Sequence, residues 1–211
     1  MAKPAYLDNN AADLVRLIKD GAVFIRPVGA ANVPTGTDWT PGPDDGQIGY
    51  YSEDGYTLTP NPGDTTEIAA HNGDPVVAET KPGYWAYAFS ALESGTTVAA
   101  AYFDIDAEDV GVDGSVTINA ASNTKRYDLV VVGLDQHENL IVAHVPNAQI
   151  SEKEAMTFNT ATLLAYGMTF RTFKGGSSAP YHIKAWGLLP QPGASSSAAA
   201  SSSAAASSSA A

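Results

Sequence analysis

The stretch from Gly46 to Phe103 places turn residues at short intervals, and this spacing restricts the chain to short antiparallel strands. The turns are built from residues that tolerate a positive φ angle, and the segments between them are rich in Thr, Val and Tyr. The turn positions are Gly49, Asp54–Gly55, Gly63–Asp64 and Asn72–Gly73. The pattern predicts a series of hairpins.

The end of this stretch changes its period. Trp85, Tyr87 and Phe89 alternate with small residues, as the side chains of a strand do. After Gly95 the apolar residues Val98 and Tyr102 fall together only at helical spacing, which predicts a short helix. The row of rings is interpreted as core, and a platform that stacks on sugar rings is the alternative.

A second helix is predicted near the N-terminus. Asn10 is a suitable N-cap, Leu14, Leu17 and Ile18 form an apolar stripe, and Gly21 follows as a stop signal. The remaining periodic segments predict strands at 22–27, 56–59, 66–70, 76–80, 84–92, 116–120, 126–133, 140–145, 156–160, 166–173 and 181–186. Many short strands at such spacing indicate a mainly β (α+β) fold, an antiparallel β-sandwich or barrel with one or two short flanking helices and a long loop.

Two segments do not fit a compact core. The stretch from Gly29 to Gly49 is rich in Gly and Pro, and a loop of this length in a small domain is usually functional or disordered. Trp39, Tyr50 and Tyr51 suggest that it docks on another surface. Residues 194–211 consist of Ala and Ser alone and are predicted to be disordered or transiently helical, with a linker as the alternative, because they offer little apolar area to bury. The expected organisation is one β domain over residues 1–193, followed by this tail.

Composition excludes several classes of protein. The 211 residues contain no Cys, so disulfides and thiolate metal sites are excluded. Residues 1–113 carry 18 Asp and Glu against 5 Lys and Arg, so the formal net charge of −12 arises in the first half. A chain this acidic would repel nucleic-acid phosphates. Neither a membrane-spanning segment nor a signal peptide is expected, so synthesis and folding in a cytoplasm are predicted.

Residues that carry chemistry are sparse. No nucleotide-binding, zinc-protease or hydrolase motif occurs, and Ser94 is interpreted as part of a helix start rather than a nucleophile. The acidic run after Asp104 departs from a calcium loop, since Ser115 stands where the loop needs Glu, and the four histidines lack ligand spacing. We therefore expect no catalysis, no metal and no cofactor.

The order of these segments resembles the major tail tube proteins of long-tailed, siphovirus-type bacteriophages, particularly those of actinobacterial hosts. The resemblance rests on SEDGYTLTPNPGDTTEI, then GDPVV, a strand that ends FSALESGTT, and a short helix. GAVFIRPVGAANVPTG from Gly21 resembles the family's opening strand and loop, and AHVPNAQIS from Ala143 resembles its Val-Pro-Asn strand exit. Where relatives often have Trp before the Gly-Asp turn, this chain has His71–Asn72.

The resemblance implies a structural virion protein with no enzymatic activity, which forms stacked hexameric rings whose lumen conducts phage DNA without binding it specifically. It further implies a tape measure protein and a tail terminator as partners. The alternatives are a carbohydrate-binding β-sandwich on a virion or cell surface and, less favoured, a hydrolase with a diffuse site. Self-assembly distinguishes the first class from the others, because rings must pair strand edges that a monomer must protect.

The resemblance also suggests site residues. Trp39, Tyr50 and Tyr51 of the long loop are expected to contact a neighbouring ring. The strand pair 66–70 and 76–80 is expected near the central channel, where Glu67, Asp74 and Glu79 would make the wall electronegative. Like charge would leave a hydrated gap around passing DNA, although acidic residues also serve solubility at an outer surface.

Overall fold

The computed structural model describes residues 14–189, except 73, 107–108 and 119. The described strands are β1 (Ile18–Pro27), β2 (Tyr51–Asn61), β3 (Thr65–Ala69), β4 (Pro75–Thr80), β5 (Tyr84–Ala91), β6 (Tyr127–Asp135), β7 (Leu140–Lys153), β8 (Tyr166–Thr172) and β9 (Lys184–Trp186), and the described helix is α1 (Thr96–Phe103). That helix is too short to cross a membrane. The predicted Asn10 helix cap and the Ser/Ala tail lie outside the described residues.

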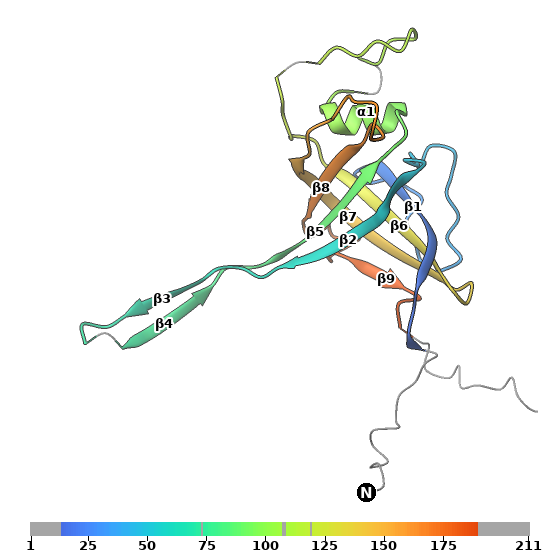
Figure 1. Cartoon of the computed structure of the whole chain (residues 1–211). Helices are drawn as coiled ribbons and strands as arrows, with labels where there is room; N and C mark the ends of the chain where they lie inside the picture. Colours follow the sequence, from blue (N-terminus) through green and yellow to red (C-terminus); the bar gives the residue numbers. More distant parts are fainter. Residues whose placement is uncertain (1–13, 73, 107–108, 119, 190–211) are drawn as a thin grey trace, which may run out of the picture.

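One antiparallel sheet forms the body of the molecule. Its strand order is β1-β6-β7-β8-β5-β2, with β9 added beside β7. The sheet curls into a half-barrel, so β2 approaches β1 and β6 across the concave side (Figure 1). There the hydroxyl of Tyr56 donates to the carbonyl of Val132 at 3.3 Å, and burial raises the pKa of Tyr56 to about 12, which keeps this donor protonated. The predicted mainly β, antiparallel fold is confirmed.

The concave face holds the main core. Side chains at alternate positions of six strands meet there, and Val98 and Ala101 of α1 cover one end. Phe89 of β5 stacks on Phe170 of β8 with 5.5 Å between ring centroids. The aromatic row is therefore core at Tyr87 and Phe89, whereas Trp85 keeps 42% of its surface exposed.

Strand β7 joins the two halves of the sheet. Its first residues pair with β6 on one edge and β9 on the other, and its last residues pair with β8. The predicted strand end at Val145 and the Val-Pro-Asn exit are wrong, because the strand runs through Pro146 to Lys153. Pro146 lies where the β6–β7 register shifts, and a proline without an N–H is tolerated at such an irregularity.

The predicted N-terminal helix is also wrong over its described part. Only Leu14 has helical, 3-10 geometry, and Ile18 already belongs to β1. The turn after β6 holds this segment in place: Arg16 pairs with Asp135 at 3.2 Å, and Leu17 N–H donates to the side chain of Gln136. Contacts far apart in sequence thus outweigh the local helical pattern.

Two predicted strands are absent from the described residues. Val116 makes one bridge to Val110 around a turn at Gly114, and no strand continues beyond it. In the segment 156–160, the side chain of Asn159 accepts hydrogen bonds from the backbone of Ala161 and Thr162. This local turn competes with strand pairing.

The β2–β5 hairpin extends beyond the body as a long arm, which we define as residues 61–84 (Figure 1). Strands β3 and β4 form a separate ribbon of two strands at its end. Every residue of β3 is exposed, as are residues 76–80 of β4. The arm is therefore a direct extension of the β2–β5 hairpin of the body, but its residues are exposed where those of the body are buried.

Candidate functional site

The arm brings together the predicted channel residues. Pairing of Ile68 with Val77 fixes the register, and a shift follows between Ile68 and Ala69. Glu67 lies opposite Ala78, whereas Glu79 lies opposite Thr66. Since directly paired residues share a face and neighbours alternate, Glu67 and Glu79 point to opposite faces of the ribbon. A ribbon that lies flat on a wall presents only one of these two carboxylates to the channel.

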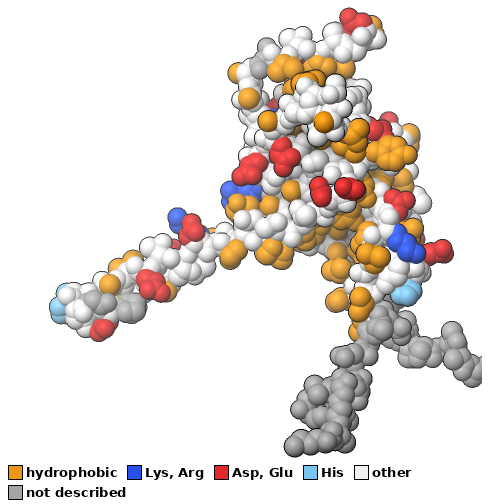
Figure 2. Space-filling view, viewed as in Figure 1, with side chains coloured by type: hydrophobic (Ala, Val, Ile, Leu, Met, Phe, Trp, Pro, Cys, Tyr) orange, Lys and Arg blue, Asp and Glu red, His pale blue; other side chains and the backbone are white. Residues whose placement is uncertain are grey.

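Asp74 lies in the turn between β3 and β4. Its backbone N–H donates to Asn72 Oδ1 at 3.3 Å, and its carbonyl accepts from Ala70 N–H at 2.8 Å. Acidic and apolar side chains both reach solvent along the arm (Figure 2). The exposed apolar residues there include Ile68, Val76 and Val77, with 57%, 66% and 53% of their surface accessible.

The three aromatic residues predicted to dock on a neighbour, Trp39, Tyr50 and Tyr51, lie in three different environments between β1 and the start of β2. Trp39 packs edge-on against Phe24 of β1, with 5.2 Å between centroids, and its indole N–H donates to the Asn32 carbonyl at 3.0 Å. Tyr51 packs partly against the main core. Only Tyr50, at 78% exposure, presents most of its ring to solvent. That these three residues contact a neighbouring ring of subunits remains a prediction.

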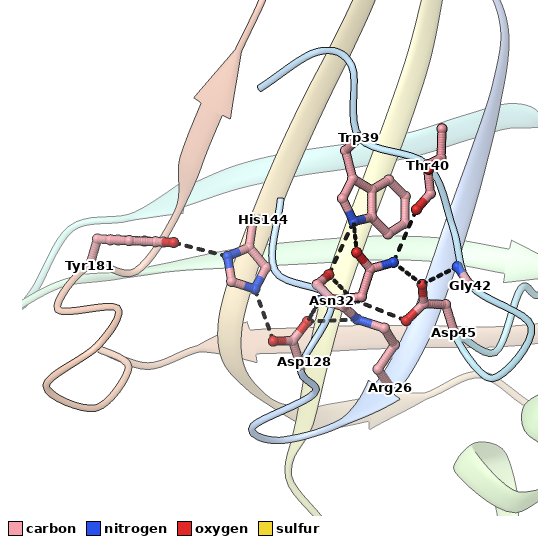
Figure 3. A network of polar contacts seen from close by, with 9 residues as sticks. All are labelled: Arg26, Asn32, Trp39, Thr40, Gly42, Asp45, Asp128, His144 and Tyr181. Carbon is pink, nitrogen blue, oxygen red and sulfur yellow. Dashed lines mark hydrogen bonds and ion pairs between the residues drawn. The ribbon is translucent and has the colours of Figure 1, made fainter. Parts of the chain in front are cut away.

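A buried polar network holds this loop on the convex face of the sheet (Figure 3). Asp128 of β6 accepts from Arg26 Nε at 3.1 Å and contacts His144 Nε2 at 2.9 Å. Arg26 Nη2 also donates to Asp128, whereas Nη1 reaches Asp45 of the loop at 3.1 Å. Tyr181 bonds to His144 Nδ1 at 2.9 Å. Charges from β1, β6 and the loop therefore compensate one another away from water.

Asp45 is the part of the network that the loop supplies. Burial by itself would raise the pKa of Asp45, but hydrogen bonds from Gly42 N–H and from the side chains of Asn32 and Arg26 outweigh it, so the pKa lies below its ordinary value. The carboxylate is thus held ionised beneath the loop. With Arg26 and His144 each 1% exposed, the network is closed to a substrate and is structural.

Sequence reasoning missed this network, although a signal was present. Arg26 and Asp128 are single charged residues inside the apolar runs AVFIRPV and YDLVVV. A lone charge in such a run needs a buried partner of opposite sign. The strand pairing that brings Arg26 opposite Asp128 joins residues far apart in sequence, so the partner could not be named beforehand.

The residues considered as metal ligands or as a nucleophile make structural contacts instead. Asp104 ends α1 with a positive φ of 57°, and its carboxylate accepts from Ser122, Thr124 and the backbone of Lys125. Among the described residues, no group of three potential metal ligands converges. Ser94 Oγ bonds to the hydroxyl of Tyr166 at 2.9 Å, and within 14–189 no histidine reaches it.

Comparisons with known proteins return no family model and no curated protein that matches the chain. Among solved structures, the chain is similar to a sheath/tube terminator of an extracellular contractile injection system, PVC, at 12% identity and a TM-score of 0.35, over 78% of this chain and 91% of that one. It is also similar to a chain of the anti-feeding prophage (AFP) baseplate at 11% identity and a TM-score of 0.41, over 89% and 99% of the two chains. Because both scores are low, we draw nothing about function from these similarities.

Proposed function

We propose that this chain is a structural subunit of a phage tail tube, which assembles with copies of itself into stacked hexameric rings around a channel for DNA. The observation that carries the proposal is the arm, whose β3–β4 ribbon has no core of its own among the described residues. An isolated ribbon of two strands is marginally stable in water. The arm therefore needs a surface that this monomer does not supply.

The two edges of the curled sheet differ, because the β1 edge is partly covered and the β2 edge, from which the arm extends, is free within the described chain. This difference supports assembly through β2. Strand β1 is covered along its middle, where Ile25 N–H donates to Gly46 O and Ile48 N–H donates to Val23 O, both at 3.0 Å. In the described residues β2 pairs only with β5, so its second edge is free. A free strand edge is a template for a neighbouring strand. Pairing of β2 with a second copy would extend the sheet around a ring.

In such a ring the arm would contribute to the channel wall, as the family resemblance implies. Asp74 and one of Glu67 and Glu79 would then face the lumen, because the ribbon separates the two glutamates. Like charge on the wall would keep DNA hydrated and free to slide. Tyr50, the most exposed of the three loop aromatics, would anchor a contact to the next ring. A tape measure protein inside and a terminator at the end would complete this virion tail.

The deciding experiment is negative-stain microscopy and light scattering of the full chain over a range of concentrations and salt. Tubes or rings are expected, and a monodisperse monomer under every condition would contradict the proposal. The double variant Ile68→Ser, Val77→Ser should fold but fail to assemble, since it removes the paired apolar side chains of one ribbon face. Val112→Ser removes a fully exposed apolar side chain outside the arm and is the control.

The proposed negative charge of the channel wall has its own test. Glu67→Lys with Asp74→Lys should still form tubes but should impair genome delivery, because a basic wall attracts phosphate at many positions. Glu79→Lys alone samples the opposite face of the ribbon. If both Lys variants deliver DNA as well as the parent does, charge on the arm has no role in the channel.

The carbohydrate-binding alternative rests on Trp85, whose ring is half exposed at the base of the arm. The surrounding surface is mostly aliphatic, whereas a sugar site needs convergent polar groups beside the ring. Trp85→Ala distinguishes the two functions, since it should abolish glycan binding if such binding exists. Assembly without measurable glycan binding favours the tail tube subunit.

A further inference from the structure

An apolar hollow of about 580 Å³ lies between β1, β2, β5 and β9 on the concave side of the half-barrel. Aliphatic and aromatic side chains dominate its lining, which includes Ile18, Leu58, Trp85, Ile141, Ile183 and Leu188. At its rim Ile18, Leu58 and Trp85 each keep 42% of their surface exposed, and Leu188 keeps 56%. A contiguous apolar surface of this kind normally marks a binding site.

The polar groups of the hollow are basic or neutral. Arg16 and His182 belong to its described lining, and none of the described residues in that lining is Asp or Glu. Arg16 pairs with Asp135 at 3.2 Å but keeps 22% of its side chain exposed. A guanidinium has five N–H donors, more than one carboxylate uses. The hollow therefore suits an apolar segment that also carries a carboxylate.

One face of the arm has this chemistry. Ile68 pairs with Val77, and Thr66 pairs with Glu79 two positions away. Because side chains alternate along a strand, these two pairs lie on the same face of the β3–β4 ribbon. Ile68 and Val77 are both more than half exposed. We define the docking face of the arm by these four residues, which combine two aliphatic side chains with one carboxylate.

The arm is held away from the hollow of its own chain (Figure 1). Leu58 in the lining belongs to β2, which continues into the arm, and Ile68 lies about 30 Å farther along the extended chain. The junction is tied at both strands, because Lys81 N–H donates to the Asp64 carbonyl at 3.0 Å. The two backbones are so close there that a Cβ at Gly63 would overlap the carbonyl of Lys81. A second copy is therefore the source of the arm that can fill the hollow.

We propose that the docking face of one copy inserts Ile68 and Val77 into the apolar hollow of a second copy, where Glu79 reaches the exposed part of Arg16. The inference rests on the proposed function, since it names the two surfaces that meet during self-assembly. The two surfaces are different parts of the same chain, so the contact is head-to-tail, the class that closes into rings or continues as a filament. The other face of the ribbon, which carries Glu67, stays outside this contact.

The absence of native Cys permits a cross-link between two full chains that each carry one thiol. A mixture of Val77→Cys and Leu188→Cys chains should form a covalent dimer under mild oxidation, with the linked positions identified by peptide mapping. Both positions are more than half exposed, so both variants should fold. The matched control mixes Ala78→Cys with Leu188→Cys, because the next residue on the same strand lies on the opposite face of the ribbon. The Val77→Cys mixture should form the mixed dimer at least tenfold faster.

Equal rates for the two mixtures would overturn the inference. Negative-stain microscopy of the parent chain separates this failure from a failure of the proposed function. Tubes together with equal cross-linking rates would refute the docking and leave the tail tube subunit standing. A tenfold faster cross-link in a chain that forms neither rings nor tubes would support the docking and contradict the tube.

The double variant Val77→Cys, Leu188→Cys tests the head-to-tail arrangement. Oxidation should give a ladder of covalent oligomers longer than the dimer, seen in non-reducing electrophoresis, because each copy donates one arm and accepts another. A product that stops at the dimer would mean that two copies exchange arms, and a disulfide within one chain would mean that the arm reaches its own hollow. Either product would overturn the proposal.

A second readout needs no disulfide. Leu188→Asp places a carboxylate at the rim of the hollow and should raise the protein concentration needed for assembly at least tenfold, as measured by light scattering. Leu163→Asp adds the same charge at a leucine that is 74% exposed and lies outside the described lining, and it should leave this concentration unchanged. Urea titration should give the same midpoint for both variants, because both leucines are exposed. Equal assembly by the two Asp variants would overturn the docking in the hollow.

Discussion

The body and the arm use the same kind of hairpin but bury it to opposite extents. In the body, β5 and β8 bring Phe89 and Phe170 together over a core that α1 closes. In the arm, the β3–β4 ribbon pairs Ile68 with Val77 and Thr65 with Thr80, and both faces reach solvent. The body can thus be stable as a monomer, whereas a ribbon of two strands without a core is marginally stable by itself in water.

The difference between the two regions lies in side-chain size. Two body strands, β5 and β8, carry aromatic residues at positions that face inward: Tyr87 and Phe89 on β5, and Tyr166 and Phe170 on β8. Apart from Pro75, the ribbon carries Thr, Glu, Ala, Ile and Val, and none of its residues is aromatic. Rings reach across a curled sheet to touch the opposite strands, but these smaller side chains do not. Backbone hydrogen bonds and cross-strand pairs therefore hold the ribbon, whereas the body adds a packed core to its ladders.

The largest effect is expected from Phe170→Ala. Phe170 is fully buried and contacts the rings of Phe89 and Tyr127, so its loss should reduce the free energy of unfolding by about 3–5 kcal/mol in urea titration. Phe158→Ala removes a ring that is 81% exposed and should change stability by less than about 0.5 kcal/mol. Similar losses in both variants would show that the concave face is not the core.

Asp128→Ala should cost about 3 kcal/mol of unfolding free energy, because it leaves the buried Arg26 without its carboxylate on β6. Asp45 still pairs with the guanidinium of Arg26 in this variant. The expected loss of unfolding free energy therefore lies near the lower end of the range for a broken buried ion pair. The control is Asp106→Ala, which removes the exposed pair with Lys125 and should cost about 1 kcal/mol or less. If the two variants are equally stable, the convex network adds nothing to the body.

Acid should destabilise the body through carboxylates whose pKa is lowered. Burial alone would raise the pKa of Asp104, but hydrogen bonds from Ser122, Thr124 and Lys125 outweigh it, and Asp45 is lowered in the same manner. A lowered folded-state pKa contributes stability above the unfolded value of about 3.9, and this contribution is lost as pH falls through the folded value. The urea midpoint should therefore decrease from pH 5 toward pH 2. Asp104→Asn should flatten the decrease, and an unchanged slope would exclude this carboxylate as a cause.

The smallest effect on the monomer is expected in the arm. The double variant Ile68→Ser, Val77→Ser should change the free energy of unfolding by less than about 0.5 kcal/mol, because both side chains are more than half exposed. Assembly is the property that should fail, as measured by scattering. A loss of monomer stability comparable to that of Phe170→Ala would mean that the arm packs on its own body in solution.

Sequence patterns predicted the elements whose causes are local. The strand from Tyr84 and the helix after Gly95 follow from alternation, a change of period and a glycine, and the turn at Gly114 adopts the positive φ angle that its residue type allows. The hairpin turn predicted at Asp54–Gly55 is wrong, because Gly55 lies inside β2, where the register with β5 shifts. The predicted ribbon differs from β3 and β4 by one residue at its ends. Antiparallel topology followed from the number of short strands.

What the sequence did not predict depends on distant pairing. Ile18 looked helical because its spacing from Leu14 fits a helix, yet the turn after β6 binds this segment. Trp39 looked like an external anchor because nothing local explains a Trp in a Gly/Pro loop, and its partner Phe24 became evident only in three dimensions. The separation of Glu67 from Glu79 required the register of β3 against β4.

The antiparallel sheet has a mechanical consequence. Strands β2 and β5 continue directly from the arm, so a pull along the arm acts along β5, whose residues 86–91 pair with residues 166–171 of β8. The applied force runs parallel to these strands and strains their cross-strand hydrogen bonds together, instead of peeling them apart in succession. Because β8 also pairs with β7 and β7 with β6, tension spreads across the width of the body. The arm should therefore resist extension far better than it resists bending.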